Sequence, residues 1–145
     1  MHAVFSLADQ TVRGARSYAE ACAVHAWKVP ALYNIAWDIS ERHADGARAL
    51  VWHSGEGDGA SYTFGDLKRL SARLAAGLAA LGLDRGSRAA LMLPQTPEHA
   101  AAHIAIFKLG AISVPLSRLF GPEALRYRLG DSGARVLLTD GENLG

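Results

Sequence analysis

The clearest pattern along the chain is a row of leucines that follows a polar pair. Leucine recurs at intervals of three or four residues, at Leu67, Leu70, Leu74, Leu78 and Leu81. This spacing places the leucines on one face of an amphipathic helix. Thr63 and Asp66 stand at the spacing of a capping box, and Gly82 follows the last leucine. The pattern therefore predicts a helix that begins after Thr63 and ends at Gly82.

The second half of the chain alternates short apolar runs with helical segments. The apolar runs cover residues 88–93, 111–114 and 135–139, and the helices between them cover 96–109 and 122–130. The runs are continuously apolar, which is typical of parallel strands covered on both faces. We therefore predict a β-α-β-α-β unit with right-handed crossovers, and the fold class α/β.

The first third of the chain is less regular. We expect a short helix over residues 17–26 and a second helix from Asn34 to about Gly46, with Ile35, Ile39 and His43 on one side. Residues 49–52 and 61–64 then read as a β-hairpin with a glycine-rich loop. We accordingly divide the chain into a helical lead-in, 1–47, and a second part, 48–145, that holds the hairpin and the β-α-β-α-β unit.

Composition and charge exclude several classes of protein. Half of the 145 residues are hydrophobic, a fifth are charged and the formal net charge is +1. A disordered chain is excluded, and nucleic-acid binding as the main activity has no basic patch to support it. No apolar stretch is long enough to span a membrane. The lone Cys22 excludes an internal disulfide, favours a cytoplasmic setting and is expected to be a small buried residue.

Two glycine-containing motifs invite a functional interpretation that their context disfavours. The run from Gly55 to Gly59 precedes a strand and lacks the G-x-G-x-x-G spacing, so we interpret it as a plain hairpin turn. Residues 130–133, Gly-Asp-Ser-Gly, resemble the surroundings of a serine-protease nucleophile. They follow a helix and precede a strand, where Gly, Asp and Ser are common loop residues. We therefore predict a loop there.

Three kinds of polar or aromatic side chain remain as candidates for a site. Glu98, His99 and His103 are the best candidates for a metal site. The two histidines stand four residues apart and can share a helix face, but the H-E-x-x-H order is absent and no third ligand is evident nearby, so we expect hydrogen-bonded histidines and no metal. Gln95 follows the carboxyl end of a predicted strand, where open α/β sheets bind ligands, and is our candidate substrate contact. The tryptophans are expected to fill the core in preference to stacking on a ligand: Trp27, Trp37 and Trp52.

Several stretches, in their order, resemble the beginning of the AMP-forming acid–CoA ligases, the adenylate-forming superfamily that includes acetyl- and medium-chain acyl-CoA synthetases. A lead-in, a Ser-Tyr-Thr-Phe-Gly-Asp-Leu motif, a strand–Pro–helix step and a Phe-Lys-Leu-Gly-Ala-Ile-Ser-Val-Pro-Leu motif carry the resemblance. The lead-in covers residues 27–30, 33–36 and 41–44, and the Ser-Tyr-Thr-Phe-Gly-Asp-Leu motif covers 61–67. The strand–Pro–helix step covers 88–98, and the last motif covers 107–116. The resemblance implies an incomplete N-terminal subdomain of the adenylate-forming fold, truncated at its C-terminus.

The resemblance also implies a chemistry. Family members activate a carboxylate with ATP and Mg²⁺ to an acyl-adenylate and pass the acyl group to CoA. A Phe-x-Pro-Glu-Ala stretch lies near the CoA entrance in acetyl-CoA synthetase-like members, which makes Phe120 and Gly121 candidate CoA contacts. The two glycines that precede this Phe in the family are Arg118 and Leu119 here.

The family's phosphate loop, with its lysine, has no counterpart in this chain. Lys28, Lys68 and Lys108 are the lysines, and none lies in a glycine-rich loop. Cationic donors and Mg²⁺ stabilise the transition state of phosphoryl chemistry. We therefore expect no catalytic residue in this chain, no tight binding of ATP, CoA or Mg²⁺ by the chain alone, and a C-terminal part of the same enzyme as its partner.

Two other functions remain open from the sequence. One is a free-standing flavodoxin-like module that binds a nucleotide or an acyl carrier. The other is a non-catalytic interaction protein derived from the ligase fold. A Ser/Thr-Gly-Thr-Thr-Gly type of loop encoded beyond Gly145 would favour the ligase over both.

Overall fold

A computed structural model describes residues 14–26, 30–55, 57 and 59–143, and the chain divides into two compact units, 1–34 and 35–145. In the first unit, α1 (Tyr18–Val24) begins after Ser17, whose hydroxyl accepts a hydrogen bond from the Glu20 backbone N–H. This confirms the short helix. Cys22 is exposed and no residue of α1 is buried. The expectation of a buried Cys22 is therefore wrong, because α1 presents no packed face to hold it.

The second unit opens on a short helical segment, η2 (Trp37–Glu41), with the wide hydrogen-bond spacing of a π-helix. It ends before the predicted Gly46, and turns carry the chain on to the first strand. Ala36 and Ser40 are buried, whereas Ile35 and Ile39 are more than 40% exposed. The small residues of this segment, and not its isoleucines, therefore face the packed interior.

The predicted hairpin is confirmed. β1 (Arg48–Trp52) pairs antiparallel with β2 (Ala60–Thr63), with Val51 opposite Ser61. The pairing register shifts once between Arg48 and Leu50. β2 passes without a loop into the next helix, so Phe64, expected as the last residue of the strand, is the first residue of the helix.

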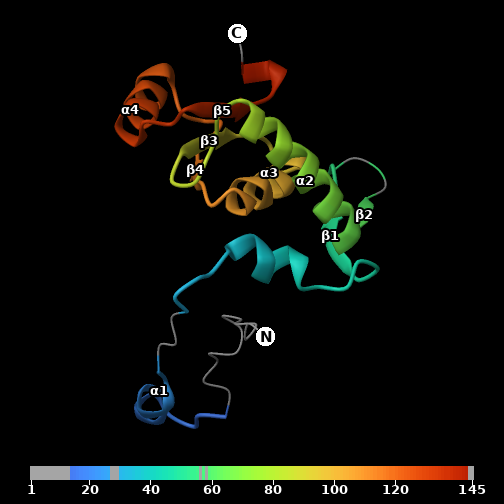
Figure 1. Ribbon diagram of the computed structural model, residues 1–145, viewed down its shortest axis with the longest axis vertical. Coiled ribbons are helices and arrows are strands. Elements are labelled where there is room, and N and C mark those ends of the chain that lie inside the picture. Colours follow the sequence, from blue (N-terminus) through green and yellow to red (C-terminus); the bar gives the residue numbers. More distant parts are fainter. Residues whose placement is uncertain (1–13, 27–29, 56, 58, 144–145) are drawn as a thin grey trace. The chain divides into compact units, whose positions relative to one another are not determined.

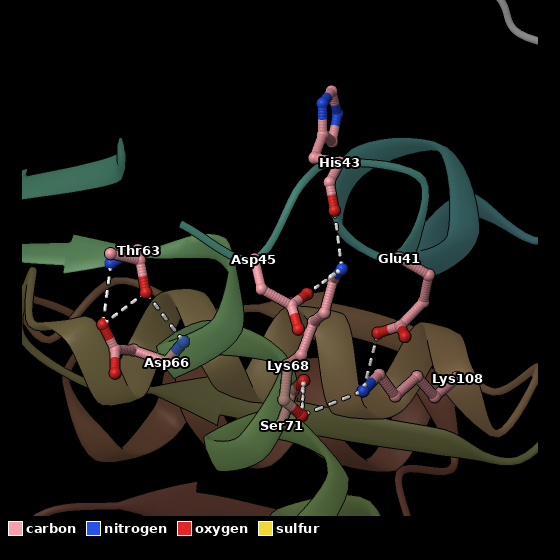
Figure 2. A network of polar contacts seen from close by, with 8 residues as sticks. All are labelled: Glu41, His43, Asp45, Thr63, Asp66, Lys68, Ser71 and Lys108. Atoms are coloured by element: carbon pink, nitrogen blue, oxygen red, sulfur yellow. Dashed lines mark hydrogen bonds and ion pairs between the residues drawn. The ribbon is translucent and has the colours of Figure 1, made fainter. Parts of the chain in front are cut away.

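The leucine-patterned helix is α2 (Phe64–Ala80), and it begins with the predicted capping box. The Asp66 backbone N–H donates to Thr63 Oγ1, and the Thr63 backbone N–H donates to the Asp66 carboxylate (Figure 2). Leu67 and Leu78 are buried, but Leu81 lies beyond the helix and is 71% exposed. The apolar face is therefore shorter than the leucine repeat, and small residues such as Ala75 complete it.

The β-α-β-α-β prediction is also confirmed. It consists of β3 (Arg88–Met92), α3 (Pro97–Lys108), β4 (Ile112–Pro115), α4 (Pro122–Ser132) and β5 (Val136–Thr139), followed by the short helix η3 (Gly141–Asn143). Within the described residues the strands are parallel and lie in the order β4-β3-β5. The central position of β3 explains its continuous apolar sequence, because both of its faces are covered.

The two faces of the sheet have separate cores. Ala89 and Leu91 of β3 pack with α2 and α3, whereas Ala90 and Met92 pack with residues of α4. In Figure 1, α4 lies on one side of the sheet strands and α2 and α3 lie on the other. These four residues of β3 are at most 4% exposed. The sheet is thus a layer between helices, and its carboxyl edge projects the turns that follow β3 and β4.

The end of α4 corrects the loop predicted over residues 130–133. Gly130, Asp131 and Ser132 belong to the last turn of the helix, and Gly133, with φ of 59°, closes it in the left-handed region. The guanidinium of Arg88 donates to the Ser132 and Gly133 carbonyls, at 2.8 and 3.2 Å. Arg88, which is 44 residues before Ser132 in the sequence, therefore supplies hydrogen bonds to carbonyls at the end of α4, which is longer than predicted.

The capping box predicts a pH dependence of stability. Hydrogen bonds from the hydroxyl and backbone N–H of Thr63 hold the pKa of Asp66 below its usual value of 3.8. A carboxyl group whose pKa is lower in the folded than in the unfolded chain stabilises the fold at pH values above its unfolded-state pKa. This stabilisation is lost as the pH falls through the folded-state pKa. We therefore expect the Asp66→Asn substitution to destabilise the chain at pH 6 and to have less effect near pH 2.5.

Urea unfolding at several pH values measures this effect. The control is Asp131→Asn, an exposed residue of α4, which should leave the acid dependence unchanged. An Asp66→Asn effect that is equal at both pH values would contradict the assigned role of the carboxylate.

Candidate functional site

The candidate site is a groove of about 660 Å³ beside the carboxyl ends of β3 and β4. Its walls come from β1 and the residue after it, from the turn between β3 and α3, from α3 and from the end of β4. The lining residues are Leu50, Val51, Trp52, His53, Gln95, Thr96, His99, Ala100, His103 and Pro115. Among the described residues, this lining contains imidazole, indole, amide and hydroxyl groups but no Lys, Arg, Asp or Glu side chain. Its chemistry suits an uncharged part of a ligand.

Side chains from both walls fix the turn that carries Gln95. The indole N–H of Trp52 donates to the Gln95 carbonyl at 2.9 Å. His99 Nδ1 lies 3.1 Å from the Pro94 carbonyl, which the Thr96 backbone N–H also contacts at 2.8 Å. The backbone carbonyls of Pro94 and Gln95 are therefore engaged, whereas the amide of Gln95 is exposed. The structure places the predicted residue at the predicted edge of the sheet, on a fixed backbone.

Two histidines of α3 line the same groove. The rings of His99 and His103 stack with centroids 5.1 Å apart and planes 17° apart. His103 Nδ1 lies 3.0 Å from the hydroxyl of Ser113 on β4. Burial, with a smaller contribution from His99, holds the pKa of His103 below its usual value. Both rings are hydrogen-bonded at one nitrogen, as expected for histidines on a packed helix.

The tryptophans are only partly explained by packing. Trp52 is half-buried and donates a hydrogen bond in the groove wall. Trp37 is half-buried as well, with the guanidinium carbon of Arg42 5.8 Å from its ring centroid. Trp27 lies outside the described residues.

Phe120 and Gly121 lie at the start of α4 and do not line the groove. Phe120 packs against the core on the α4 side of the sheet, and the guanidinium carbon of Arg128 lies 4.1 Å from its ring centroid. Gly121 is the exposed N-cap of α4, and a Cβ placed there would meet no atom within 4 Å. Gln95 on one side and Phe120 and Gly121 on the other are thus separate candidate contacts.

Arg118 stands in the loop before these residues and is held by acidic groups. Its guanidinium pairs with Asp140 at 3.2 Å and with Glu142 at 2.8 Å. These contacts join the loop after β4 to the segment after β5. Where the resemblance expects glycine, this chain carries a cation that is already paired.

A polar network between η2, α2 and α3 was not predicted from the sequence (Figure 2). Lys68 Nζ donates to Asp45 Oδ1 and to the His43 carbonyl, each at 2.6 Å. Lys108 Nζ pairs with Glu41 at 2.9 Å and donates to the Lys68 carbonyl at 3.2 Å. Both ammonium groups are therefore bound within the chain. The only signal in the sequence was a lysine among the apolar residues at the end of α3.

The fold and the position of the groove together define a structural class. A parallel sheet between helical layers, preceded by an antiparallel hairpin, is an α/β architecture, and the groove lies where such sheets bind ligands. Residues 37–144 match the model of the AMP-binding enzyme family. The chain belongs to this family. Within the residues that the structure describes, no helix combines the length and the apolar character needed to cross a bilayer.

Curated relatives and solved structures agree with this assignment. The chain is 36% identical over 117 residues to the acetyl-coenzyme A synthetase of Gemmatimonas aurantiaca, an alignment of 78% of this chain and 18% of the relative. It is 33% identical to the 3-hydroxypropionyl-coenzyme A synthetase of Sulfurisphaera tokodaii, again over 78% and 18%. The chain thus spans about a fifth of the length of these relatives.

Among solved structures, the acyl-CoA synthetase of Brucella canis superimposes with a TM-score of 0.77 and 31% identity, over 97% of this chain and 26% of that one. The N-terminal domain of FACL13 from Mycobacterium tuberculosis gives a TM-score of 0.67 and 28% identity, over 78% and 28%. The α/β fold of this chain is therefore that of the N-terminal region of acyl-CoA synthetases.

Proposed function

We propose that this chain is the N-terminal part of a ligase that activates a carboxylate with ATP to an acyl-adenylate and transfers the acyl group to CoA. The observation that carries the proposal is the match of residues 37–144 to the AMP-binding enzymes. Relatives named as acetyl- and 3-hydroxypropionyl-coenzyme A synthetases support the reaction type. This chemistry places the enzyme in acyl metabolism, and we expect it to act in the cytoplasm.

The part played by the chain is that of a scaffold. In this proposal residues 1–47 would be the lead-in and residues 48–145 the start of the AMP-binding domain, although the match to the AMP-binding enzymes already begins at residue 37. Lys68 and Lys108 are engaged in the network with Asp45 and Glu41, so neither ammonium group is free to bind the phosphates of ATP. In the part of the chain that the structure describes, no acidic cluster suits Mg²⁺. Lys68, Lys108 and the described acidic residues therefore offer no site for ATP and Mg²⁺, and the C-terminal part of the ligase would hold them.

The groove and the start of α4 would contribute contacts to the substrates. The uncharged lining around Gln95 suits an acyl chain or another uncharged portion of a substrate, with the amide as the polar contact. Phe120 and the exposed Gly121 would border the entrance for CoA, and the paired cation Arg118 would replace the open glycine surface there. The carboxylate itself is left to residues outside this chain.

Calorimetry on the isolated chain tests the scaffold role. Titration with MgATP, and separately with CoA, should give no saturable heat, because no cation in a phosphate-binding loop is present. Tight binding of MgATP by the 145-residue chain would contradict the proposal. A positive control is the same titration of a complete acyl-CoA synthetase under identical conditions.

A further inference from the structure

His99 and His103 have the sequence spacing of metal-binding histidines. They stand at positions i and i+4 of α3, the spacing of the two histidines in the zinc motif H-E-x-x-H. Both rings line the groove, and their centroids are 5.1 Å apart. Alanines separate them in sequence, so no bulky side chain intervenes. The helix thus presents two imidazoles side by side at one wall of the groove.

Each ring makes its hydrogen bond through the same nitrogen, Nδ1. A backbone carbonyl can only accept, so His99 Nδ1 must carry the hydrogen that faces Pro94, and Nε2 of the neutral ring carries a lone pair. This Nε2 atom is buried and has no hydrogen-bond partner. His103 Nδ1 lies 3.0 Å from the Ser113 hydroxyl, and when that hydroxyl accepts the hydrogen bond, the lone pair of the neutral ring lies on Nε2. Metal-binding histidines typically donate their other ring N–H in this way.

The surroundings of the two rings admit a cation. Among the described residues that line the groove there is no Lys or Arg side chain, so no fixed positive charge there opposes a metal ion. A buried acceptor without a hydrogen-bond partner, such as His99 Nε2, is unfavourable. A bound cation would supply the missing partner.

Contrary to the expectation of no metal from the sequence, we propose that His99 and His103 bind a divalent transition-metal ion, such as Zn²⁺, through their Nε2 atoms. Imidazole nitrogen suits Zn²⁺, Co²⁺ or Cu²⁺ better than Mg²⁺ or Ca²⁺. Zn–N bonds of about 2.0–2.1 Å require the two lone pairs to converge, so binding draws the rings out of their present stack. Among the described residues no set of three or more His, Cys, Asp and Glu side chains converges. Water or a ligand bound in the groove would therefore fill the remaining coordination positions.

His53 lines the same groove and provides a matched control. Its Nδ1 accepts a hydrogen bond from the Gly55 backbone N–H at 3.0 Å, so the neutral ring carries its hydrogen on Nε2 and presents no lone pair there. The proposed site therefore consists of the two histidines of α3 and excludes His53. This site is independent of the proposed ligase function.

Titration of the chain with Co²⁺, followed by visible absorption and by competition with Zn²⁺, tests the site. We expect saturable binding that His99→Ala and His103→Ala each weaken by at least a hundredfold. Ser113→Ala should weaken it by roughly tenfold, the low end of the loss typical for an outer partner of a metal-binding histidine. His53→Ala should bind as the unsubstituted chain does. Far-UV circular dichroism verifies that each variant is folded.

Nuclear magnetic resonance of the unsubstituted chain gives a test that does not depend on the variants. Zn²⁺ should shift the Nε2 resonances of His99 and His103 and leave those of His53 in place. The proposal is overturned by the absence of saturable Co²⁺ absorption, by equal losses in His53→Ala and His99→Ala, or by Zn²⁺ shifts at histidines other than this pair.

Discussion

The Leu91→Ala substitution should lower the free energy of unfolding by about 3 kcal/mol, within the 2–5 kcal/mol observed for buried leucines. Leu91 is fully buried in β3, the central strand of the sheet, and packs in the core with α2 and α3. Removing its side chain leaves a cavity beside neighbours such as Leu78 and Ile106. These side chains are themselves held by packing in the same cluster, so they cannot move far enough to fill the cavity. Urea unfolding followed by circular dichroism measures the loss.

Leu119→Ala is the matched control, because that side chain is 95% exposed. It should change the free energy of unfolding by less than about 0.5 kcal/mol. If Leu91→Ala does not fold, Leu91→Met, which conserves volume, should cost less than about 1.5 kcal/mol. Equal effects of Leu91→Ala and Leu119→Ala would show that β3 is not the centre of the core.

The Lys108→Met substitution should cost about 2 kcal/mol, less than the roughly 3–5 kcal/mol for breaking a fully buried pair. Lys108 is 19% exposed and its partner Glu41 is 36% exposed, so solvent screens the carboxylate that is left behind. The substitution also removes the hydrogen bond to the Lys68 carbonyl and loosens η2 from α3. Urea unfolding at pH 7 measures the cost.

A double-mutant cycle separates charge from packing in this pair. Glu41→Gln should recover part of the loss in the Lys108→Met background, because it removes the unpaired charge. Arg69→Met, which breaks an exposed pair with Asp66, should cost less than about 1 kcal/mol. Additive effects of the Lys108 and Glu41 substitutions would mean that the ion pair contributes nothing to the fold.

Local sequence signals predicted the elements because each signal acts within a few residues. The capping box at Thr63 and Asp66, the Thr-Pro-Glu start of α3 and the apolar run of β3 depend only on neighbours in the chain. The last turn of α4 was missed because Arg88, 44 residues away, binds its carbonyls. No local pattern contains that contact.

Only one wall of the candidate site, the turn after β3 that carries Gln95, was predictable from the sequence. Gln95 followed from the rule that ligands bind at the carboxyl ends of parallel strands. The opposite wall was not predictable, since Trp52 reaches the Gln95 carbonyl from 43 residues away. The Lys68 and Lys108 network was missed for the same reason, because it depends on how η2, α2 and α3 pack together.

The central claim is that this chain is the N-terminal scaffold of an acyl-CoA synthetase, and a chimera tests it most directly. The chain would replace the aligned segment of the Gemmatimonas aurantiaca acetyl-coenzyme A synthetase, to which it is 36% identical. The measurement is the release of AMP that requires acetate, ATP and CoA. We expect the folded chimera to release AMP and the chain alone to release none. A folded chimera without activity, or AMP release by the chain alone, would contradict it.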